Sequence, residues 1–341
     1  MTLPLNKNYA PMEALPATEL PSGREWQYEP KWDGFRCLAF RDGTRVDLQS
    51  KSGKPLTRYF PELTSALLAV KPAKFVLDGE IVIPVEGHLS FDELLMRIHP
   101  AASRVLKLSQ EHPCVFIVFD LLVDEKGKSL VKQPLKERRQ KLERLAKSAF
   151  DENASISLSP VTDDLAAARK WFHMGVGLDG IVAKRKDLPY QTGERTGMQK
   201  IKKQRTADCV VGGFRYLEKK PLVGSLLLGL YNEKGLLDHV GFSSSIQADE
   251  RLALTRKLEK IINPPGFTGK APGGLSRWST KHSMEWQPLD PKLVVEVQFD
   301  HFTGGRFRHG TRFLRWRPEK APRECTMKQV KRENKSAMGL L

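Results

Sequence analysis

The sequence has few features of a secreted or membrane protein. Its four cysteines are far apart in the chain: Cys37, Cys114, Cys209 and Cys325. They form no CxxC pair, so neither a disulfide framework nor a zinc finger is predicted. Residues 1–17 lack the basic start and the apolar run of a signal peptide. The longest apolar run, residues 114–123, is interrupted by Asp120 and is too short to span a bilayer. We therefore expect a cytoplasmic protein without a membrane partner.

Acidic residues are also scarce relative to basic ones. The 341 residues include 40 Asp or Glu and 56 Lys or Arg, which gives a formal net charge of +16. An enzyme for small acids or neutral metabolites has no need of this charge, so a polyanion, first of all nucleic acid, is the expected partner. Hydrophobic residues at 40% and charged residues at 28% are typical of a globular protein. The length fits two domains or one large domain.

Much of the positive charge lies near the C-terminus. Residues 304–335 contain eleven Lys or Arg against three acidic residues, a local excess of +8. Residues 312–317 alternate like a strand, and we expect Arg312, Arg315 and Arg317 on one face, where they would match phosphates. The segment after Pro322 is expected to be a disordered basic tail.

The stretch from Glu29 to Arg36 is the clearest candidate for chemistry. Pro30 disfavours a helical conformation at Glu29, and Gly34 permits a sharp bend, so strand, turn and strand are predicted with Lys31 at the turn. A lysine acts as a nucleophile only as the free amine, and its ordinary pKa is about 10.4. Burial or nearby positive charge would lower that pKa. An ordinary hairpin with an Asp-Gly turn is the alternative.

The first two thirds of the chain predict antiparallel strands with helices between them. Strands are expected over 26–29, 35–40, 45–48, 75–83, 115–119, 178–184 and 200–203, and helices over 60–70, 91–98, 134–150 and 163–174. The strand over 75–83 carries Asp78, Gly79 and Glu80 among apolar residues, which is costly without partners, so Glu80 is expected to face a site. Asp179 precedes Gly180, either at a site or in an ordinary turn. Lys200 and Lys202 should share one face of their strand.

From Thr206 onward the pattern changes to short strands and glycine turns. Strands over 208–214, 225–231, 236–241 and 293–299, with a helix over 249–262, predict a small β-barrel, for which an OB-fold is the obvious candidate. We place the domain boundary between Lys203 and Asp208.

Together these segments resemble the covalent nucleotidyltransferases, and specifically the ATP-dependent DNA ligases. The resemblance rests on motifs in the family's order: Lys31 to Arg36, Ser50 to Gly53, Asp78 to Glu80, Phe119 to Leu121, Asp179 to Lys184, Lys200 with Lys202, and Arg312 to Lys320. It is nearest to the small bacterial end-joining ligases, of the ligase C type or the ligase domain of the ligase D type. It implies an α+β fold: a nucleotidyltransferase (adenylation) domain over 1–204, with antiparallel sheets and flanking helices, and a C-terminal OB-fold domain with a basic end over 205–341.

The resemblance also implies roles for individual residues. Lys31 would form the lysine-AMP, assisted by Lys200 and Lys202 at the α-phosphate, and Phe119 would stack on adenine. The implied nucleotide-binding residues are Glu29, Lys31, Arg36, Lys51, Glu80, Phe119, Val182, Lys200 and Lys202. Glu80 and Asp179 would bind Mg²⁺ or Mn²⁺. The residues expected to contact DNA or phosphate are Arg306, Arg308, Arg312, Arg315, Arg317 and Lys320.

The implied substrates are ATP and nicked or broken double-stranded DNA. A monomer in the bacterial cytoplasm, associated with the nucleoid through DNA, is expected, with end-joining or base-excision repair proteins as possible partners. The chain departs from the family at three positions, with Lys51 for the usual arginine, Asp179 for glutamate and Met198 for a frequent tryptophan. Asp179 is one methylene shorter, so its metal contact would run through water.

Two other functions fit part of the pattern. An mRNA-capping guanylyltransferase or an RNA ligase would share the lysine motif, but Phe119 to Leu121 and Arg312 to Lys320 favour a DNA ligase. A non-catalytic DNA-binding protein would account for the charge alone, and would keep its function after Lys31→Ala.

Overall fold

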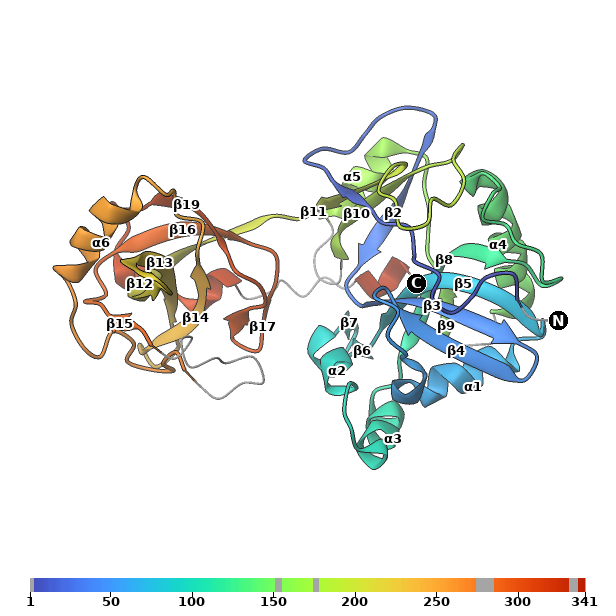
Figure 1. Ribbon diagram of the computed structural model, residues 1–341, viewed down its shortest axis with the longest axis horizontal. Coiled ribbons are helices and arrows are strands. Elements are labelled where there is room, and N and C mark those ends of the chain that lie inside the picture. The colour runs from blue at the N-terminus through green and yellow to red at the C-terminus, as the bar shows by residue number, and fades with distance from the viewer. Residues whose placement is uncertain (1–2, 151–154, 174–177, 274–284, 331–336, 341) are drawn as a thin grey trace. The chain divides into compact units, whose positions relative to one another are not determined.

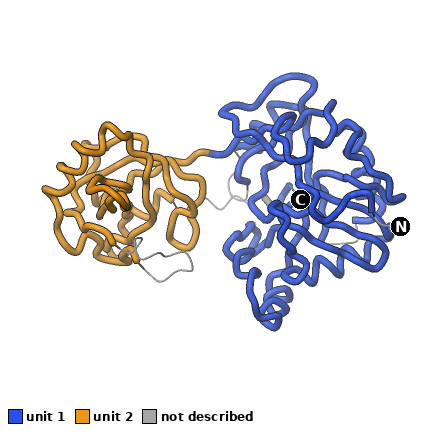
Figure 2. The backbone as a smooth tube through the Cα atoms, viewed as in Figure 1, with its two compact units in different colours: residues 1–203, 333–341 blue, residues 204–332 orange. Residues whose placement is uncertain are grey.

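The structure, a computed structural model, describes residues 3–150, 155–173, 178–273, 285–330 and 337–340. The chain forms two compact units, one of residues 1–203 with 333–341 and the other of residues 204–332 (Figure 2). The second unit begins where the sequence pattern changes. It ends before residue 341, the predicted end of the second domain, because residues 333–341 group with the first unit.

The first unit contains two main sheets (Figure 1). The four-stranded sheet is ordered β1 (Leu15–Pro16), β11 (Met198–Lys202), β10 (Leu178–Arg185) and β2 (Trp26–Trp32). The five-stranded sheet is ordered β4 (Arg45–Ser50), β3 (Phe35–Asp42), β5 (Lys74–Val82), β8 (Val115–Val123) and β9 (Ile156–Leu158). A small pair is formed by β6 (Pro84–Val85) and β7 (His88–Leu89). Pairing is antiparallel except for β1 with β11 and β8 with β9.

Helices flank these sheets, as the sequence predicts. They are α1 (Pro61–Ala69), α2 (Phe91–Met96), α3 (Ala102–Glu111), α4 (Leu135–Ala149) and α5 (Leu165–His173), with single turns η1 (Thr57–Tyr59) and η5 (Ala337–Leu340). Leu63 and Leu67 of α1 and Leu142 of α4 are fully buried in one core cluster with Leu77 of β5. Helix α3 was not predicted. The last residue of the helix expected over 163–174 lies outside the described residues.

The two sheets of the first unit are connected by the turn between β2 and β3. Gly34 lies in this turn, where a Cβ would overlap the backbone oxygen of Ile81 in β5. A side chain at this position would therefore separate β3 from β5. Lys31 on β2 and Arg36 on β3 lie on either side of this turn and line the same cavity, so residues of both sheets reach one site.

The second unit is built around one antiparallel sheet. Its order is β14 (Leu237–Ser243), β13 (Lys220–Tyr231), β12 (Arg205–Leu217), β16 (Val294–Phe299) and β19 (Arg312–Trp316), with β15 (Gln287–Pro288) on β12. The remaining elements are α6 (Arg251–Glu259), the pair β17 (Phe302–Thr303) and β18 (Arg306–Phe307), and the turns η3 (Pro322–Glu324) and η4 (Met327–Val330).

The two edge strands of this sheet meet. Ser243 Oγ at the end of β14 donates to the Thr311 oxygen at 2.9 Å, and Thr311 N donates to the Phe242 oxygen at 3.0 Å. These contacts form an isolated bridge between the two edges, so the sheet curves round on itself as in a small barrel. The predicted OB-fold class is thereby confirmed. The prediction of a disordered tail after Pro322 is wrong as far as Val330, because this segment forms η3 and η4 and buries Cys325 and Val330 in the core of the second unit. Residues 331–336 and 341 lie outside the described ranges.

No helix within the described ranges is long and apolar enough to cross a membrane.

Candidate active site

Strand register brings the predicted site residues into two cross-strand rows. In the first row, Val182 of β10 lies opposite Glu29 of β2 on one side and opposite Lys200 of β11 on the other. In the second, Gly180 lies between Lys31 and Lys202. Residues directly opposite one another on neighbouring strands have Cβ atoms about 5 Å apart. Motifs separated by more than a hundred residues in the chain therefore share one surface.

A bulge in β10 places Asp179 beside Lys31. The pairing of β10 with β2 shifts register between Leu178 and Gly180, which leaves Asp179 out of the regular ladder. Gly180 is required here, since its φ is +146° and a Cβ would overlap the Ile201 oxygen. The buried Asp179 carboxylate accepts a hydrogen bond from Lys31 Nζ and lies 3.7 Å from Lys202 Nζ. Asp179 is thus part of a site, and the ordinary turn alternative does not describe it.

The charges around Lys31 hold its amine in the protonated form. Burial by itself would lower the pKa of Lys31, but the charge of Asp179, the hydrogen bond to it and the charges of Glu80 and Asp33 outweigh burial and raise that pKa. Lys200 behaves in the opposite way: burial and the charges of Lys31 and other cations lower its pKa. The pKa depression that a nucleophilic lysine requires is therefore absent at Lys31 in the free chain.

The five-stranded sheet contributes a second group of side chains. Arg36 of β3 lies opposite Glu80 of β5. Burial raises the pKa of Glu80 to about 7, against the opposing effects of the Lys31 and Arg36 charges. Arg36 donates to both carboxylate oxygens of Asp78, at 2.6 and 2.7 Å. Glu80 thus faces the site, as its place in an apolar strand suggested.

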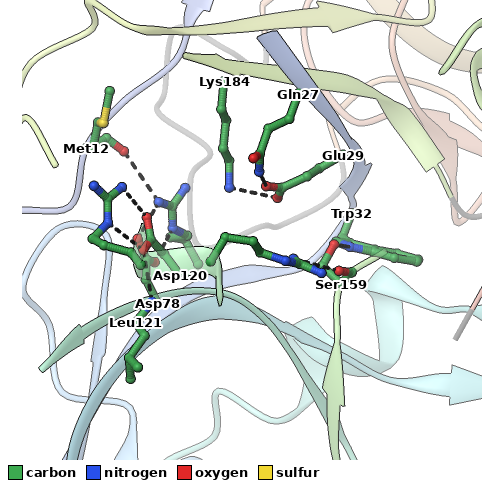
Figure 3. A network of polar contacts seen from close by, with 12 residues as sticks. Met12, Gln27, Glu29, Trp32, Asp78, Asp120, Leu121, Ser159 and Lys184 are labelled. Carbon is green, nitrogen blue, oxygen red and sulfur yellow. Dashed lines mark hydrogen bonds and ion pairs between the residues drawn. The ribbon is translucent and has the colours of Figure 1, made fainter. Parts of the chain in front are cut away.

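Phe119 forms an apolar wall with cations on its ring. The Arg36 guanidinium lies 4.5 Å and Lys184 Nζ 4.3 Å from the ring centroid. Lys184 also donates to Glu29 Oε2 at 2.7 Å, and Gln27 donates to Glu29 Oε1 at 3.0 Å (Figure 3). Lys184 was not predicted as a site residue, although it ends the run from Asp179 that the sequence singled out.

These side chains line a cavity of about 200 Å³. It is lined by Met12, Glu13, Ala14, Glu29, Pro30, Lys31, Trp32, Arg36, Lys51, Glu80, Phe119, Val182, Lys184, Met198 and Lys200. The predicted nucleotide-binding residues all lie here except Lys202, which reaches the site through Asp179. Sequence reasoning missed the N-terminal segment over 12–14.

Glu13 from that segment binds two basic residues at the cavity. Its carboxylate lies 3.1 Å from Lys51 Nζ and 3.2 Å from Arg195 Nη2. The hydrogen bond from Lys51 is the main reason why the pKa of Glu13 is lowered. Lys51, predicted from a basic loop that could equally have been a solvated turn, is thus held at the cavity.

The predicted arginine row lies in the second unit. Pairing of β16 with β19 matches Glu296 with Arg315 and then Val297 with Phe313, so Leu314 forms a bulge. In a regular strand, Arg312 and Arg315 would point to opposite faces. The bulge places both on the same face, opposite the face of the partly buried Phe313 and Trp316. Arg315 lies 2.7 Å from Glu296, and Arg317 lies 2.9 Å from Asp208.

The remaining predicted contacts are also in the second unit. Arg306 lies in β18, with Nη2 3.4 Å from His239 Nδ1, and Lys320 lies 3.1 Å from Glu324. Arg308 follows β18 and donates its backbone N–H to the His301 oxygen at 3.0 Å.

Comparison with known proteins identifies the family of both parts of the chain. The pattern described as "ATP dependent DNA ligase domain" matches residues 11–202, and the pattern described as "ATP dependent DNA ligase C terminal region" matches residues 219–320. DNA ligase C2 of Mycolicibacterium smegmatis is 43% identical over 351 residues, covering 97% of this chain and 96% of that protein.

Two more distant proteins agree. The multifunctional non-homologous end joining DNA repair protein LigD of Mycobacterium tuberculosis is 30% identical over 93% of this chain and 39% of that protein. A solved structure from a study of Lig E DNA ligases has the same fold, with a TM-score of 0.54 and 18% identity over 90% of this chain and 100% of that one. The chain belongs to the family of ATP-dependent DNA ligases.

Proposed function

We propose that this chain seals breaks between a 5′-phosphate and a 3′-hydroxyl in double-stranded DNA, with Lys31 as the residue that carries AMP. The observation that supports this role most directly is the pair of cross-strand rows on β2, β10 and β11. These rows hold Lys31 beside Asp179, with Lys200 and Lys202 on the same sheet.

In the first step Lys31 Nζ attacks the α-phosphorus of ATP. A P–N bond forms, the bond from the α-phosphorus to the bridging oxygen breaks, and pyrophosphate leaves with the electron pair of that bond. The amine must lose its proton, so Asp179, which accepts a hydrogen bond from it, is placed to influence this loss. Lys200 and Lys202 provide positive charge where the α-phosphate gains negative charge.

The base would bind against Phe119. Stacking on an aromatic face tolerates any base, so selectivity for adenine must come from polar groups at the edge of the base. Glu29 offers carboxylate oxygens that accept hydrogen bonds, and Lys184, which lies 2.7 Å from Glu29, offers N–H donors. Since Lys184 Nζ lies 4.3 Å from the centroid of the Phe119 ring, this pair is suited to read the base.

A divalent metal fits the donor set of the site. Asp179 and Glu80 both act electrostatically on Lys31, so both carboxylates lie near the attacking amine. Mg²⁺ prefers one or two carboxylates together with water and substrate phosphates. When bound by Asp179 and Glu80, Mg²⁺ or Mn²⁺ would neutralise phosphate charge and lower the pKa of Lys31. Asp179, shorter than glutamate, would reach the ion through water.

The later steps return Lys31 to its free form. An oxygen of the DNA 5′-phosphate attacks the AMP phosphorus, the P–N bond breaks, and the Lys31 nitrogen regains a proton. The DNA 3′-hydroxyl then attacks the 5′-phosphate, a phosphodiester forms and AMP leaves. We propose Arg306, Arg308, Arg312, Arg315, Arg317 and Lys320 as the contacts for DNA or phosphate. A role in repair, including end joining, agrees with the names of the relatives. We further propose that the chain acts as a monomer beside other repair proteins.

Intact-mass measurement tests the first step. The purified chain is incubated with Mg²⁺ and either ATP or GTP, and the mass of one AMP is expected to appear with ATP only. The adduct should disappear in Lys31→Ala. Lys186→Ala is the matched control. The exposed fractions of the two lysine side chains are 23% for Lys186 and 22% for Lys31, and Lys186 is also paired with a carboxylate.

Three results would contradict the proposal. Labelling by GTP alone would indicate a capping enzyme, and an AMP adduct retained in Lys31→Ala would move the nucleophile elsewhere. A chain that forms the adduct but seals RNA in preference to nicked DNA would be an RNA ligase.

A further inference from the structure

Phe119 lies in a bulge of β8. Asp78 of β5 pairs with Asp120, and the next residue, Gly79, pairs with Val118, so Phe119 has no partner in the ladder. In a regular strand, adjacent side chains point to opposite faces of the sheet. Here Phe119 and Asp120 both line one narrow space together with Arg36 and Tyr190. The bulge is what lets both side chains lie on the nucleotide side of the sheet.

This arrangement places two buried carboxylates opposite each other. Asp78 and Asp120 are directly paired, and their exposed fractions are 0% and 4% (Figure 3). Like charges at such positions destabilise a sheet, and buried charges require partners. Each carboxylate is bound by one arginine through two hydrogen bonds, Asp78 by Arg36 at 2.6 and 2.7 Å and Asp120 by Arg138 at 2.8 Å for both.

The two pairs differ in their distance from the cavity. Arg36 lines the cavity, whereas Arg138 comes from α4 and is absent from the cavity wall. Arg138 is 2% exposed and also donates to the Gln133 oxygen at 2.7 Å. Its guanidinium lies 5.5 Å from the ring centroid of Tyr190, whose hydroxyl donates to Asp78 at 2.6 Å.

Arg138 therefore lies behind this cavity and not on its wall. It lines the narrow space that Phe119, Asp120 and Arg36 also line, and it binds the Asp120 carboxylate. Without Arg138, the buried Asp120 carboxylate would face Asp78 without a cationic partner and would keep the hydrogen bond from Leu121 N at 2.9 Å. Turning Asp120 to the other face would relieve that repulsion, but it would also remove the bulge and move Phe119.

We propose that Arg138 is a positioning residue for the first step of ligation, which holds Phe119 against the base through Asp120 and the β8 bulge. This inference rests on the proposed function, since it assigns Phe119 to the adenine of ATP. Stacking on Phe119 would be the same in the bound substrate and the transition state. Loss of its position should then weaken ATP binding more than it slows the chemical step.

The test follows formation of the AMP adduct against ATP concentration in Arg138→Met. The half-saturating ATP concentration should rise about tenfold, which corresponds to loss of one stacking contact, while the limiting rate changes little. Arg138→Lys, which keeps the charge but not the two parallel hydrogen bonds, should give an intermediate rise. It also provides the measurement if Arg138→Met does not fold.

Arg97→Met is the matched control for loss of a buried arginine. Arg97 is 0% exposed, binds Glu62 at 2.7 Å and lies 5.1 Å from the ring centroid of Phe60, within the core on the other side of the sheet. The thermal stability of Arg97→Met should fall as in Arg138→Met. The half-saturating ATP concentration of Arg97→Met should stay within twofold of the value for the unsubstituted chain.

A double-mutant cycle with Phe119→Leu separates positioning from general loss of structure. If Arg138 acts through Phe119, the double variant should be hardly worse than Phe119→Leu alone. The inference would be overturned if the two substitutions raised the half-saturating ATP concentration independently, so that their fold-changes multiply in the double variant. An unchanged half-saturating concentration in a folded Arg138 variant would also overturn it. An unsubstituted chain that forms no AMP adduct would instead overturn the proposed function, and this inference with it.

Discussion

The amine of Lys31 donates a hydrogen bond to the carboxylate of Asp179, 148 positions later in the chain. The contact raises the pKa of Lys31 in the free chain, despite the burial that would lower it. A nucleophile held in its protonated form does not react. For the nucleophile that we propose, a cation that competes for Asp179 would favour loss of the Lys31 proton.

Asp179→Asn should separate the acidity of Lys31 from its reactivity toward ATP. Burial would then dominate, so the pKa of Lys31 should fall and acetylation of Lys31 by acetic anhydride at pH 8 should become faster. Formation of the AMP adduct should fall by about 10- to 100-fold, because one of the two carboxylates that we propose to bind the metal is lost. Peptide mass mapping measures both, with acetylation of Lys186 as the internal reference. Unchanged acetylation of Lys31 would show that Asp179 does not control its proton.

Glu80 should give the reaction a pH dependence. Burial raises its pKa from 4.5 to about 7. If Glu80 binds the metal as we propose, AMP-adduct formation should rise with pH through about 7 as its carboxylate ionises. Higher Mg²⁺ concentration should move this rise to lower pH. The measurement is the initial rate between pH 5.5 and 9. A flat profile in the unsubstituted chain would contradict the assignment.

The same shift predicts an effect of Glu80 on stability. Between pH 4.5 and about 7 the folded chain holds a proton that the unfolded chain has released, so stability falls as pH rises through this window. The stability of Glu80→Gln minus that of the unsubstituted chain should therefore be more favourable at pH 8 than at pH 5. Thermal unfolding at the two pH values measures this difference, and an equal difference at both would contradict it.

Gly180→Ala should disrupt the first unit. The added Cβ would overlap the Ile201 oxygen at a φ of +146°, so β11 would have to separate from β10. A cost above about 3 kcal/mol is expected, since steric overlap adds to backbone strain. Gly53→Ala is the matched control: φ is +76°, but no atom lies within 4 Å of the added Cβ, so a cost of about 1 kcal/mol is expected. Thermal unfolding compares them, and equal costs would contradict the packing argument.

Arg312→Gln should reduce the salt dependence of DNA binding. Each phosphate contact contributes about −0.9 to the slope of log affinity against log salt, so the slope should become shallower by about one unit. Arg256→Gln, at an exposed position on α6, serves as the control of equal charge change. Fluorescence anisotropy with nicked DNA at several salt concentrations measures the slope. An equal change in both variants would indicate that net charge alone matters.

Much of the fold followed from local pattern. Alternating or clustered apolar residues predicted β2 and β3, and β-branched and aromatic residues predicted β5; all three strands are buried over most of their length on both faces. Amphipathic spacing predicted α1 and α4, which bury one face. Helix α3 was missed because few of its side chains are buried: only Val105 and Ser109 face the interior.

The residue types of the candidate site could be predicted from the sequence, but the contacts between these residues could not. Lys31, Glu80 and Asp179 stood out because charged residues beside glycines interrupted apolar strands. The order of the motifs did not show that Gly180 lies between Lys31 and Lys202, nor that Lys184 contacts both Glu29 and Phe119. Bulges at Asp179, Phe119 and Leu314 break the two-residue period on which strand predictions depend.

The sequence alone determined which chemistry the chain carries, because residue types and their spacing decide what nucleophile, carboxylates and cations are available. Only the tertiary structure decided the protonation of the groups that would carry it out. The pKa of Lys31 depends on whether burial or the Asp179 charge prevails, and this balance depends on distances between strands that are remote in the chain.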